Sequence, residues 1–320
     1  MRPKEPKVGV LARARSLLGL HPVTRLRRAG RGSRGLVRCT LVVLALTVLA
    51  VEVPSLQARA AGIAGGPARL RVHFIDVGQG DAVLVEAPSG KTMLIDGGPP
   101  ESSDRLVEYL KVHGVSKLDV VVSTHPHADH IGGLIEVLRE FKVGLVVDSG
   151  KVHTTATYER FLSLIDEKGI DFRLGRAGGD IDLGPGVEAR ILSPVEPLPE
   201  NINDCSVVIR LRYGTTSFLF TGDAERDAED AMIRRGVELG ATVLKVAHHG
   251  SSTSSKPWFL EEVKPAVAVI LVGAGNPFGH PHRVTLVNLA EHTDEIYRTD
   301  THGDVLVVTD GTTFQVSTAR

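Results

Sequence analysis

The sequence contains little cysteine, since Cys39 and Cys205 are the only two in 320 residues. Cys39 lies in an N-terminal segment that we expect to be removed, which leaves Cys205 without a partner inside the chain. A framework of disulfide bonds is therefore excluded. We predict that Cys205 is a free, buried structural thiol.

A positively charged surface is also missing from most of the chain. The first 60 residues hold twelve of the 37 Lys and Arg residues and two of the 38 Asp and Glu residues, so residues 61–320 carry 25 basic and 36 acidic side chains, a formal charge of −11. Basic and aromatic residues are not interleaved as on surfaces that stack bases. These absences argue against a domain that gathers nucleic acids through non-specific electrostatic attraction.

The apolar run near the N-terminus is short, because residues 40–51 provide twelve residues whereas a membrane span needs about 20. It follows a segment, residues 1–38, with eleven Lys or Arg against one acid, and it precedes the small residues Ala58-Arg59-Ala60-Ala61. This order predicts a signal peptide over residues 1–60 that is cut after Ala60. The alternative is an uncut anchor with its basic end in the cytoplasm. Residues 61–320 would be secreted if the leader is cut, and anchored to the outer face of the cytoplasmic membrane if it is not.

What the sequence does contain is a dense group of histidines. The segment from His125 to His130 places three histidines and one aspartate within six residues. It directly follows the apolar run 118–123, which reads as a buried parallel strand, and helical spacing begins at Ile131. The group therefore lies on a strand-to-helix turn at the carboxyl edge of a sheet, where α/β proteins usually bind ligands.

The spacing of these residues suits two metal ions. Residues i and i+2 of an extended segment point the same way, so His125 and His127 can present ring nitrogens to one ion. Asp129 and His130 lie where the chain turns into the helix and can face a second ion. Two ions about 3.5–4 Å apart hold a hydroxide and both ends of a displacement at phosphorus. The alternative, a helix-capping aspartate among surface histidines, is disfavoured by the complete pattern after a buried strand.

Other polar clusters also follow predicted strands. Thr221-Gly222-Asp223 closes the strand 217–220, His248-His249 follows the strand that begins at residue 242, and Gly279 to His282 follows the strand 267–272. Asp96 ends a strand either as a carboxylate that orients a metal-bound histidine or as a turn residue, and Asp81 is interpreted as a turn residue. With helices expected at 102–113, 158–168, 224–235, 257–263 and 283–292, the alternation predicts two sheets covered by helices, with the site along one edge.

These motifs together resemble the metallo-β-lactamase-fold hydrolases, most closely the soluble hydrolase domain of ComEC-like competence (DNA-internalisation) proteins. The matching segments follow in order over roughly residues 70–310; they are Asp76 to Asp81, His125 to Gly133, Thr221 to Asp223, Lys245 to Ser252, Gly279 to His282 and Tyr297 to Asp300. The resemblance implies an α/β fold, an αββα sandwich formed as a single domain by residues 61–320. It also implies a site for one or two metal ions, and we expect two divalent ions, Zn²⁺ or Mn²⁺.

The resemblance further assigns roles to the site residues. His125 and His127 would bind one ion, Asp129 and His130 the other, and Asp223 would bridge the two. One of His248 and His249 would be the last ligand and the other a catalytic acid; we take His249 as the ligand. His280 could replace either one. The predicted catalytic residues are thus His248, Asp129 and His280.

One position departs from the pattern of the resemblance, in which many relatives have a third histidine before the bridging aspartate. Here that neighbourhood is Asn203-Asp204, so Asp204 is the candidate ligand, with an Asx turn as the alternative. An oxygen ligand in place of nitrogen favours Mn²⁺ relative to Zn²⁺. The predicted metal ligands are His125, His127, Asp129, His130, Asp204, Asp223 and His249.

The expected function is that of an exported, metal-dependent phosphodiesterase or nuclease that uses a metal-bridged hydroxide. DNA is the substrate that the resemblance suggests, whereas a small phosphodiester of the cell envelope suits the acidic charge equally well. One alternative is hydrolysis of a lactam or a thioester. Another is a non-catalytic binding protein that retains the metal for structure. We expect a monomer that touches the membrane only through an uncleaved leader.

Overall fold

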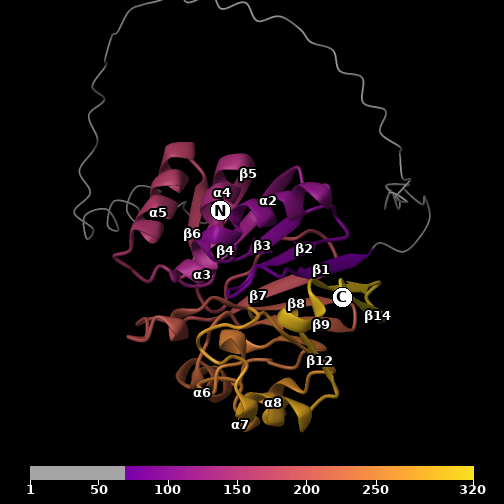
Figure 1. The fold of residues 1–320 in the computed structure, drawn as a ribbon. Helices are drawn as coiled ribbons and strands as arrows, with labels where there is room; N and C mark the ends of the chain where they lie inside the picture. Colours follow the sequence, from indigo (N-terminus) through magenta and orange to yellow (C-terminus); the bar gives the residue numbers. More distant parts are fainter. Residues whose placement is uncertain (1–68) are drawn as a thin grey trace, which may run out of the picture.

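The computed structural model describes residues 69–320 (Figure 1). The predicted leader, residues 1–60, and its cleavage site lie outside these residues. None of the helices within residues 69–320 is long and apolar enough to span a membrane.

The first sheet has eight strands in the order β14-β13-β1-β2-β3-β4-β5-β6. Its strands β3 to β6 are parallel, and the remaining pairs are antiparallel. The apolar run expected to be a parallel strand is β4, which is parallel to both of its neighbours. The strands are β1 (Leu70–Phe74), β2 (Val83–Glu86), β3 (Thr92–Ile95), β4 (Lys117–Ser123), β5 (Lys142–Asp148), β6 (Asp171–Leu174), β13 (Val305–Thr309) and β14 (Phe314–Thr318).

The second sheet has six strands in the order β12-β11-β10-β9-β8-β7. Its strands β9 to β12 are parallel, while β7, β8 and β9 form an antiparallel meander. These strands are β7 (Val187–Ser193), β8 (Val208–Tyr213), β9 (Thr216–Phe220), β10 (Val243–Lys245), β11 (Val267–Ile270) and β12 (Glu295–Arg298). β6 and β12 were not expected from the sequence, because both are short, carry no fully buried residue and lie at a sheet edge.

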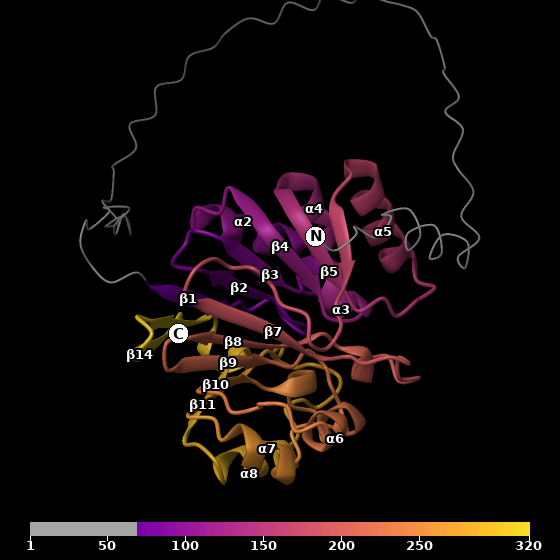
Figure 2. The same ribbon diagram turned by 180° about the vertical axis from the view of Figure 1, so that it is seen from behind.

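Helices cover the outer face of each sheet, as Figures 1 and 2 show from opposite sides. The first sheet carries α2 (Ser103–Val112), α3 (Ala128–Ile131), α4 (Leu134–Glu140) and α5 (Ala156–Lys168), and the second carries α6 (Arg226–Arg234), α7 (Pro257–Val263) and α8 (Arg283–Ala290). The short α9 (Thr299–His302) follows β12, and three 3₁₀ helices are η1 (Pro100–Ser102), η2 (Asn203–Cys205) and η3 (Ala247–Gly250). The predicted α/β fold, an αββα sandwich, is confirmed.

Three apolar clusters hold the layers together. One lies between the sheets and includes Phe74 and Phe218, both fully buried. A second joins the first sheet to its helices, and a third joins the second sheet to α6, α7 and α8. The alternating strands thus bury one face against the opposite sheet and the other face against helices. Polar residues follow within a few positions of the carboxyl ends of β3, β4, β9 and β10.

Cys205 is buried and free of any disulfide among the described residues, as predicted. Its Sγ donates to the carbonyl oxygens of Pro199 and Asn201, at 3.3 Å each. The thiol therefore helps to hold the connection from Pro194 to Asn203 against the sheet.

Candidate metal centre

The structure brings together most of the predicted site residues at the ends of strands from both sheets. Nε2 of His130, in α3, lies 3.2 Å from Oδ2 of Asp223, which follows β9. Nε2 of His249, which follows β10, lies 3.6 Å from the same oxygen and 3.3 Å from Oδ2 of Asp129. Ligand atoms of these four residues all lie within 4.8 Å of one another. Segments more than a hundred residues apart in sequence thus meet at one point between the two sheets.

His125 and His127 lie on the adjoining side of this group. Nε2 of His125 is 2.9 Å from Nδ1 of His127 and 3.8 Å from Oδ2 of Asp223. His125 is fully buried, and burial holds the pKa of its imidazole well below the usual range. A neutral imidazole is the form that binds a metal ion. The structure therefore gathers both halves of the histidine motif around Asp223, and their assignment to two separate ions stays a prediction.

The donor atoms of the centre fit a divalent cation. Of the ten buried side-chain atoms that have no hydrogen-bond partner within the described residues, four lie in the centre: His130 Nε2, His249 Nε2, Asp223 Oδ1 and Asp81 Oδ1. Buried polar atoms are nearly always paired, so four unpaired ones gathered at one point require an explanation. Imidazole nitrogens and carboxylate oxygens are the ligands that Zn²⁺ and Mn²⁺ accept.

Asp96 fixes the orientation of His130. It is fully buried, and its Oδ2 accepts from Nδ1 of His130 at 2.8 Å and from Oγ1 of Thr124 at 2.6 Å, while Oδ1 accepts from the Thr124 backbone at 2.8 Å. A proton held on Nδ1 leaves Nε2 of His130 free to face Asp223. Of the two interpretations given to Asp96 from sequence, the structure favours the carboxylate that orients a histidine.

Glycines let the loop that carries Asp96 approach the turn that follows His130. The loop after β3 lies directly on the turn between α3 and α4, where the Gly97 N–H donates to the His130 carbonyl at 2.7 Å and the Gly133 N–H donates to the Gly98 carbonyl at 2.9 Å. A Cβ on Gly133 would overlap the Gly97 carbonyl oxygen. The helix predicted to continue from Ile131 accordingly stops at Gly132 and starts again at Leu134.

The backbone is strained where the site residues emerge. Asp96, His248 and His249 adopt positive φ values of 57°, 50° and 54°. Residues other than glycine avoid this left-handed region, and such strain concentrates at functional sites because the surrounding structure has to enforce it. The consecutive strained pair turns His248 and His249 in different directions from the end of β10. Their ring planes lie 66° apart.

The histidines and carboxylates of the centre shift one another's pKa values. Burial disfavours the charged imidazolium, but the carboxylate of Asp223 outweighs it and holds the pKa of His130 well above its usual range. The same balance, with Asp129 and Asp81 adding to Asp223, raises the pKa of His249 to about 10. In turn, His130 and His249 overcome the burial of Asp223 and hold its pKa well below the usual range. Protons on the two histidines thus balance the carboxylates.

His248 differs from His249 in being partly exposed, with 22% of its side chain accessible. Its Nε2 lies 3.8 Å from Oδ2 of Asp223, and its Nδ1 lies 3.0 Å from Oε1 of Glu225. His248 lowers the pKa of Glu225 to about 2, so this carboxylate is ionised and orients the ring. His249 is instead buried among the ligand atoms, and its Nδ1 donates to the Leu271 carbonyl at 2.9 Å. Of the two, His249 alone belongs to the group of candidate ligand atoms, and the roles of His249 as ligand and His248 as acid stay predictions.

His280 lies at the rim. Its ring centroid is 5.5 Å from that of His248 and 6.2 Å from that of His249. Burial and the neighbouring histidines lower its pKa to about 4. His280 therefore stays close enough to take part, but it is not within the group of ligand atoms.

The structure does not bring Asp204 into the centre. Its Oδ1 accepts from the backbone N–H groups of Glu225 and Ala228, at 2.9 and 3.2 Å, and so caps the start of α6. Asp204 is absent from both groups of potential ligands in the described residues. The prediction that Asp204 binds metal is corrected accordingly, because its carboxylate already satisfies the first turn of a helix.

Three functional residues were missed from the sequence or given another role. Asp81, interpreted as a turn residue, is buried in the centre, where it forms an ion pair with Lys245 and lies 3.4 Å from Nδ1 of His249. Lys245 is itself 2% exposed and donates to the Gly222 carbonyl at 2.8 Å. Glu225 is the third. For the ion pair of Asp81 and Lys245, the only signal in the sequence was a lysine at the end of an otherwise apolar strand.

Comparisons with known proteins agree with this architecture. The model of the family "Metallo-beta-lactamase superfamily" matches residues 75–274. "ComE operon protein 3" of Bacillus subtilis (strain 168) is 31% identical over 252 residues, which cover 73% of this chain and 32% of that protein. "Recombination protein 2" of Haemophilus influenzae is 30% identical over 242 residues, which cover 74% of this chain and 28% of that protein. The chain thus spans less than two thirds of either relative.

Among solved structures, the chain is similar to Igni18, described as a novel metallo hydrolase from the hyperthermophilic archaeon Ignicoccus hospitalis. The two are 20% identical with a TM-score of 0.49, and the match covers 74% of this chain and 98% of the other.

Proposed function

The chain belongs to the metallo-beta-lactamase superfamily, and from that premise we propose that it is a metal-dependent phosphodiesterase that acts outside the cytoplasm. The observation that carries the proposal is the convergence of His130, His249, Asp129 and Asp223, with ligand atoms within 4.8 Å, beside a partly exposed histidine that no ligand role requires. A purely structural metal site is usually closed and has no use for a spare acid.

Seven residues would hold or support the cations. His125, His127, Asp129, His130, Asp223 and His249 are the proposed ligands, and Asp96 orients His130. Divalent cations bound there polarise a phosphoryl oxygen and supply a nucleophilic water at neutral pH. Lys245 keeps Asp81 charged and in place, and Asp81 in turn holds His249.

His248 is the proposed general acid. Its ring is held by Glu225 on one side and reaches to 3.8 Å from Asp223 on the other. This position lets Nε2 deliver a proton to an oxygen that leaves phosphorus. His280, 5.5 Å away between ring centroids, lines the same rim.

Two substrate classes fit the proposal, and its cofactors are two divalent ions, Zn²⁺ or Mn²⁺. DNA is suggested by the names of the relatives, "ComE operon protein 3" and "Recombination protein 2". A small phosphodiester of the cell envelope fits the formal charge of −11 of residues 61–320. Location outside the cytoplasm rests on the basic and apolar leader, and contact with the membrane would come through that leader alone. We propose a monomer.

The test is hydrolysis of bis-p-nitrophenyl phosphate by the purified protein with Mn²⁺ or Zn²⁺. We expect turnover in the wild type and its loss in Asp129→Ala, whereas His248→Ala should lose about 10²-fold or more in kcat with its metal content unchanged. Bound metal without hydrolysis of a diester would refute the enzyme proposal. Turnover of nitrocefin or of a thioester in place of the diester would reassign the substrate. Steep loss of single-stranded DNA cleavage with added salt would identify a polymer substrate, and a flat response a small one.

A further inference from the structure

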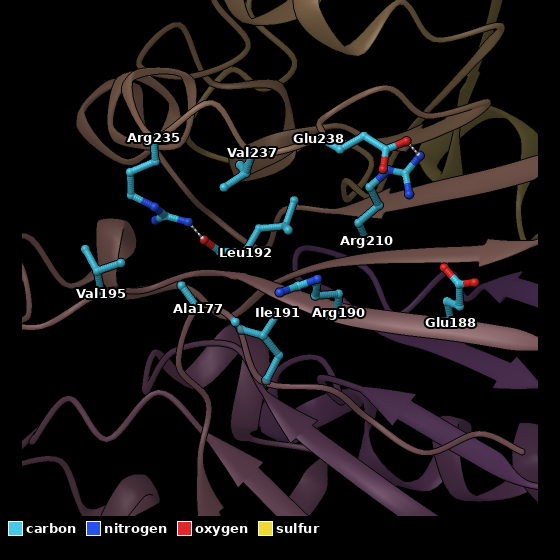
Figure 3. A pocket seen from close by; sticks show the side chains of 11 residues that line it. Ala177, Glu188, Arg190, Ile191, Leu192, Val195, Arg210, Arg235, Val237 and Glu238 are labelled. Atoms are coloured by element: carbon cyan, nitrogen blue, oxygen red, sulfur yellow. Dashed lines mark hydrogen bonds and ion pairs between the residues drawn. The ribbon is translucent and has the colours of Figure 1, made fainter.

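A pocket lies on the outer face of the six-stranded sheet, away from the candidate ligands. Its volume is about 480 Å³, and it is formed by β7, β8 and the segment after α6. Figure 3 shows three arginines around it, Arg190 from β7, Arg210 from β8 and Arg235 beyond α6. None of its lining residues belongs to the metal centre.

Two of these arginines face each other with like charge. Arg190 and Arg210 are direct partners across the antiparallel pair of β7 and β8. Like charges directly opposite in a sheet are destabilising, so this pairing needs an anion nearby to be favourable. Glu238 supplies one for Arg210, at 2.5 Å, and the Arg210 Nε donates to the Gly240 carbonyl at 2.9 Å. Arg190 forms no ion pair within residues 69–320, although Asp180 is its partner across an isolated antiparallel bridge.

The two carboxylates that line the pocket form no ion pair with Arg190 or Arg235. Glu188 is committed to Arg212 at 2.7 Å, and Glu238 is committed to Arg210. Arg235 donates to the uncharged Leu192 carbonyl at 2.6 Å and forms no ion pair with any described residue. Arg190 and Arg235 therefore concentrate positive charge in one hollow of a domain whose formal charge is −11.

The remaining wall of the pocket is apolar. Val195 and Val237 line it, and Val195 is 36% exposed. Such a pocket, with apolar walls and a few charged groups placed to one side, is the usual form of a small-molecule site. Guanidinium groups bind phosphate by paired, charge-assisted hydrogen bonds and are less strongly hydrated than a lysine ammonium.

We propose that this pocket binds the phosphate group of a small organic anion, with Arg190 and Arg235 as its charged partners and Val195 and Val237 in contact with its apolar part. The site is independent of the hydrolytic function proposed above. A ligand there would relieve the repulsion between Arg190 and Arg210, which gives binding a gain in addition to its own contacts. The phosphate could belong to a free organic phosphate or to a nucleotide within a single strand.

The experiment is a calorimetric titration of the metal-loaded protein with phenyl phosphate, with inorganic phosphate and with an oligothymidylate. Arg190→Gln should weaken phenyl phosphate binding about tenfold or more, because one charge-assisted pair is lost. The matched control is Arg234→Gln, since Arg234 is an exposed neighbour of Arg235 that does not line the pocket. Arg190→Gln should melt no lower than the wild type and should hydrolyse the diester at the wild-type rate.

Loss of affinity for phenyl phosphate alone assigns the pocket to free organic phosphates, and loss for the oligothymidylate alone assigns it to a nucleic-acid backbone. Val237→Asn should reduce the preference for phenyl phosphate over inorganic phosphate, and an unchanged preference would refute the apolar half of the site. Equal affinities in Arg190→Gln, Arg234→Gln and the wild type would refute the site altogether.

Discussion

Replacing Asp96 with asparagine tests how the chain prepares its metal ligands. The carboxylate of Asp96 accepts from three donors, the backbone N–H and the hydroxyl of Thr124 and the Nδ1–H of His130. Asparagine has the same shape, and its oxygen can keep the contact with the Thr124 backbone. Its amide would then place N–H donors where Oδ2 now accepts from His130 at 2.8 Å. The imidazole would have to move its proton from Nδ1 to Nε2, the nitrogen that faces Asp223.

The size of the effect follows from this exchange of tautomers. Loss of a carboxylate that orients a metal-bound histidine costs about 10- to 100-fold in metal affinity, which is about 1.4–2.8 kcal/mol. Asp96 is fully buried, so water does not replace the lost acceptor. We therefore expect a loss toward the upper end of this range. Diester hydrolysis at limiting metal should fall in proportion and should recover at saturating metal.

The assay is competition for Zn²⁺ or Mn²⁺ against a chromophoric chelator, together with metal content after dialysis. Asp148→Asn is the matched control, because Asp148 is also fully buried and ends β5, the strand next to β4 in the same sheet. Its Oδ1 accepts from Gly150 and Tyr158 and contacts no ligand. It should lose stability but keep the wild-type metal affinity. Wild-type affinity in Asp96→Asn, or an equal loss in both variants, would refute the tautomer argument.

Three further predictions concern buried charge. Lys245→Met leaves Asp81 buried without its partner and should lower the free energy of unfolding by about 3–5 kcal/mol in urea denaturation, with partial recovery on adding Asp81→Asn. Burial raises the pKa of Glu229 from 4.5 to about 8, so between these pH values the folded state keeps a proton that the unfolded chain loses. The free energy of unfolding should therefore fall as the pH rises through this interval. Glu229→Gln should remove this dependence of stability on pH. Because the pKa of His130 is raised well above its usual range and that of His249 is raised to about 10, a metal ion has to displace two protons, and chelator competition should show affinity increasing about a hundredfold per pH unit between about pH 6 and 8.

Local pattern was sufficient for most of the fold and for much of the centre. Buried strands such as β4 are continuous apolar runs, and their carboxyl ends in a parallel sheet must lie at one edge. The His125 to His130 motif could therefore be placed at that edge without knowledge of the fold. The edge strands β6 and β12 were not predicted, because a short strand with half-exposed residues has no distinctive periodicity.

Asp81, Lys245 and Asp204 show where local pattern stops being informative. Gly78-Gln79-Gly80-Asp81 has the composition of a turn, and the lysine that pairs with Asp81 lies 164 positions later in the chain. The carboxylate of Asp204 is of a type that binds metal ions. It accepts a hydrogen bond at the start of α6, however, and so caps that helix instead of joining the centre. In each case the role depends on which distant backbone the carboxylate meets, which only the packing of the two sheets determines.

The charge balance of the centre explains why one set of residues can serve both the fold and the chemistry. Four carboxylates, Asp81, Asp96, Asp129 and Asp223, lie around His130 and His249, and a single lysine offsets them permanently. Protons on the two histidines add further positive charge when no cation is bound, because the surrounding carboxylates raise the pKa of each. A divalent ion supplies the same charge and releases those protons. Metal binding therefore exchanges one form of neutralisation for another, and the sandwich need not open or rearrange to accept the ions.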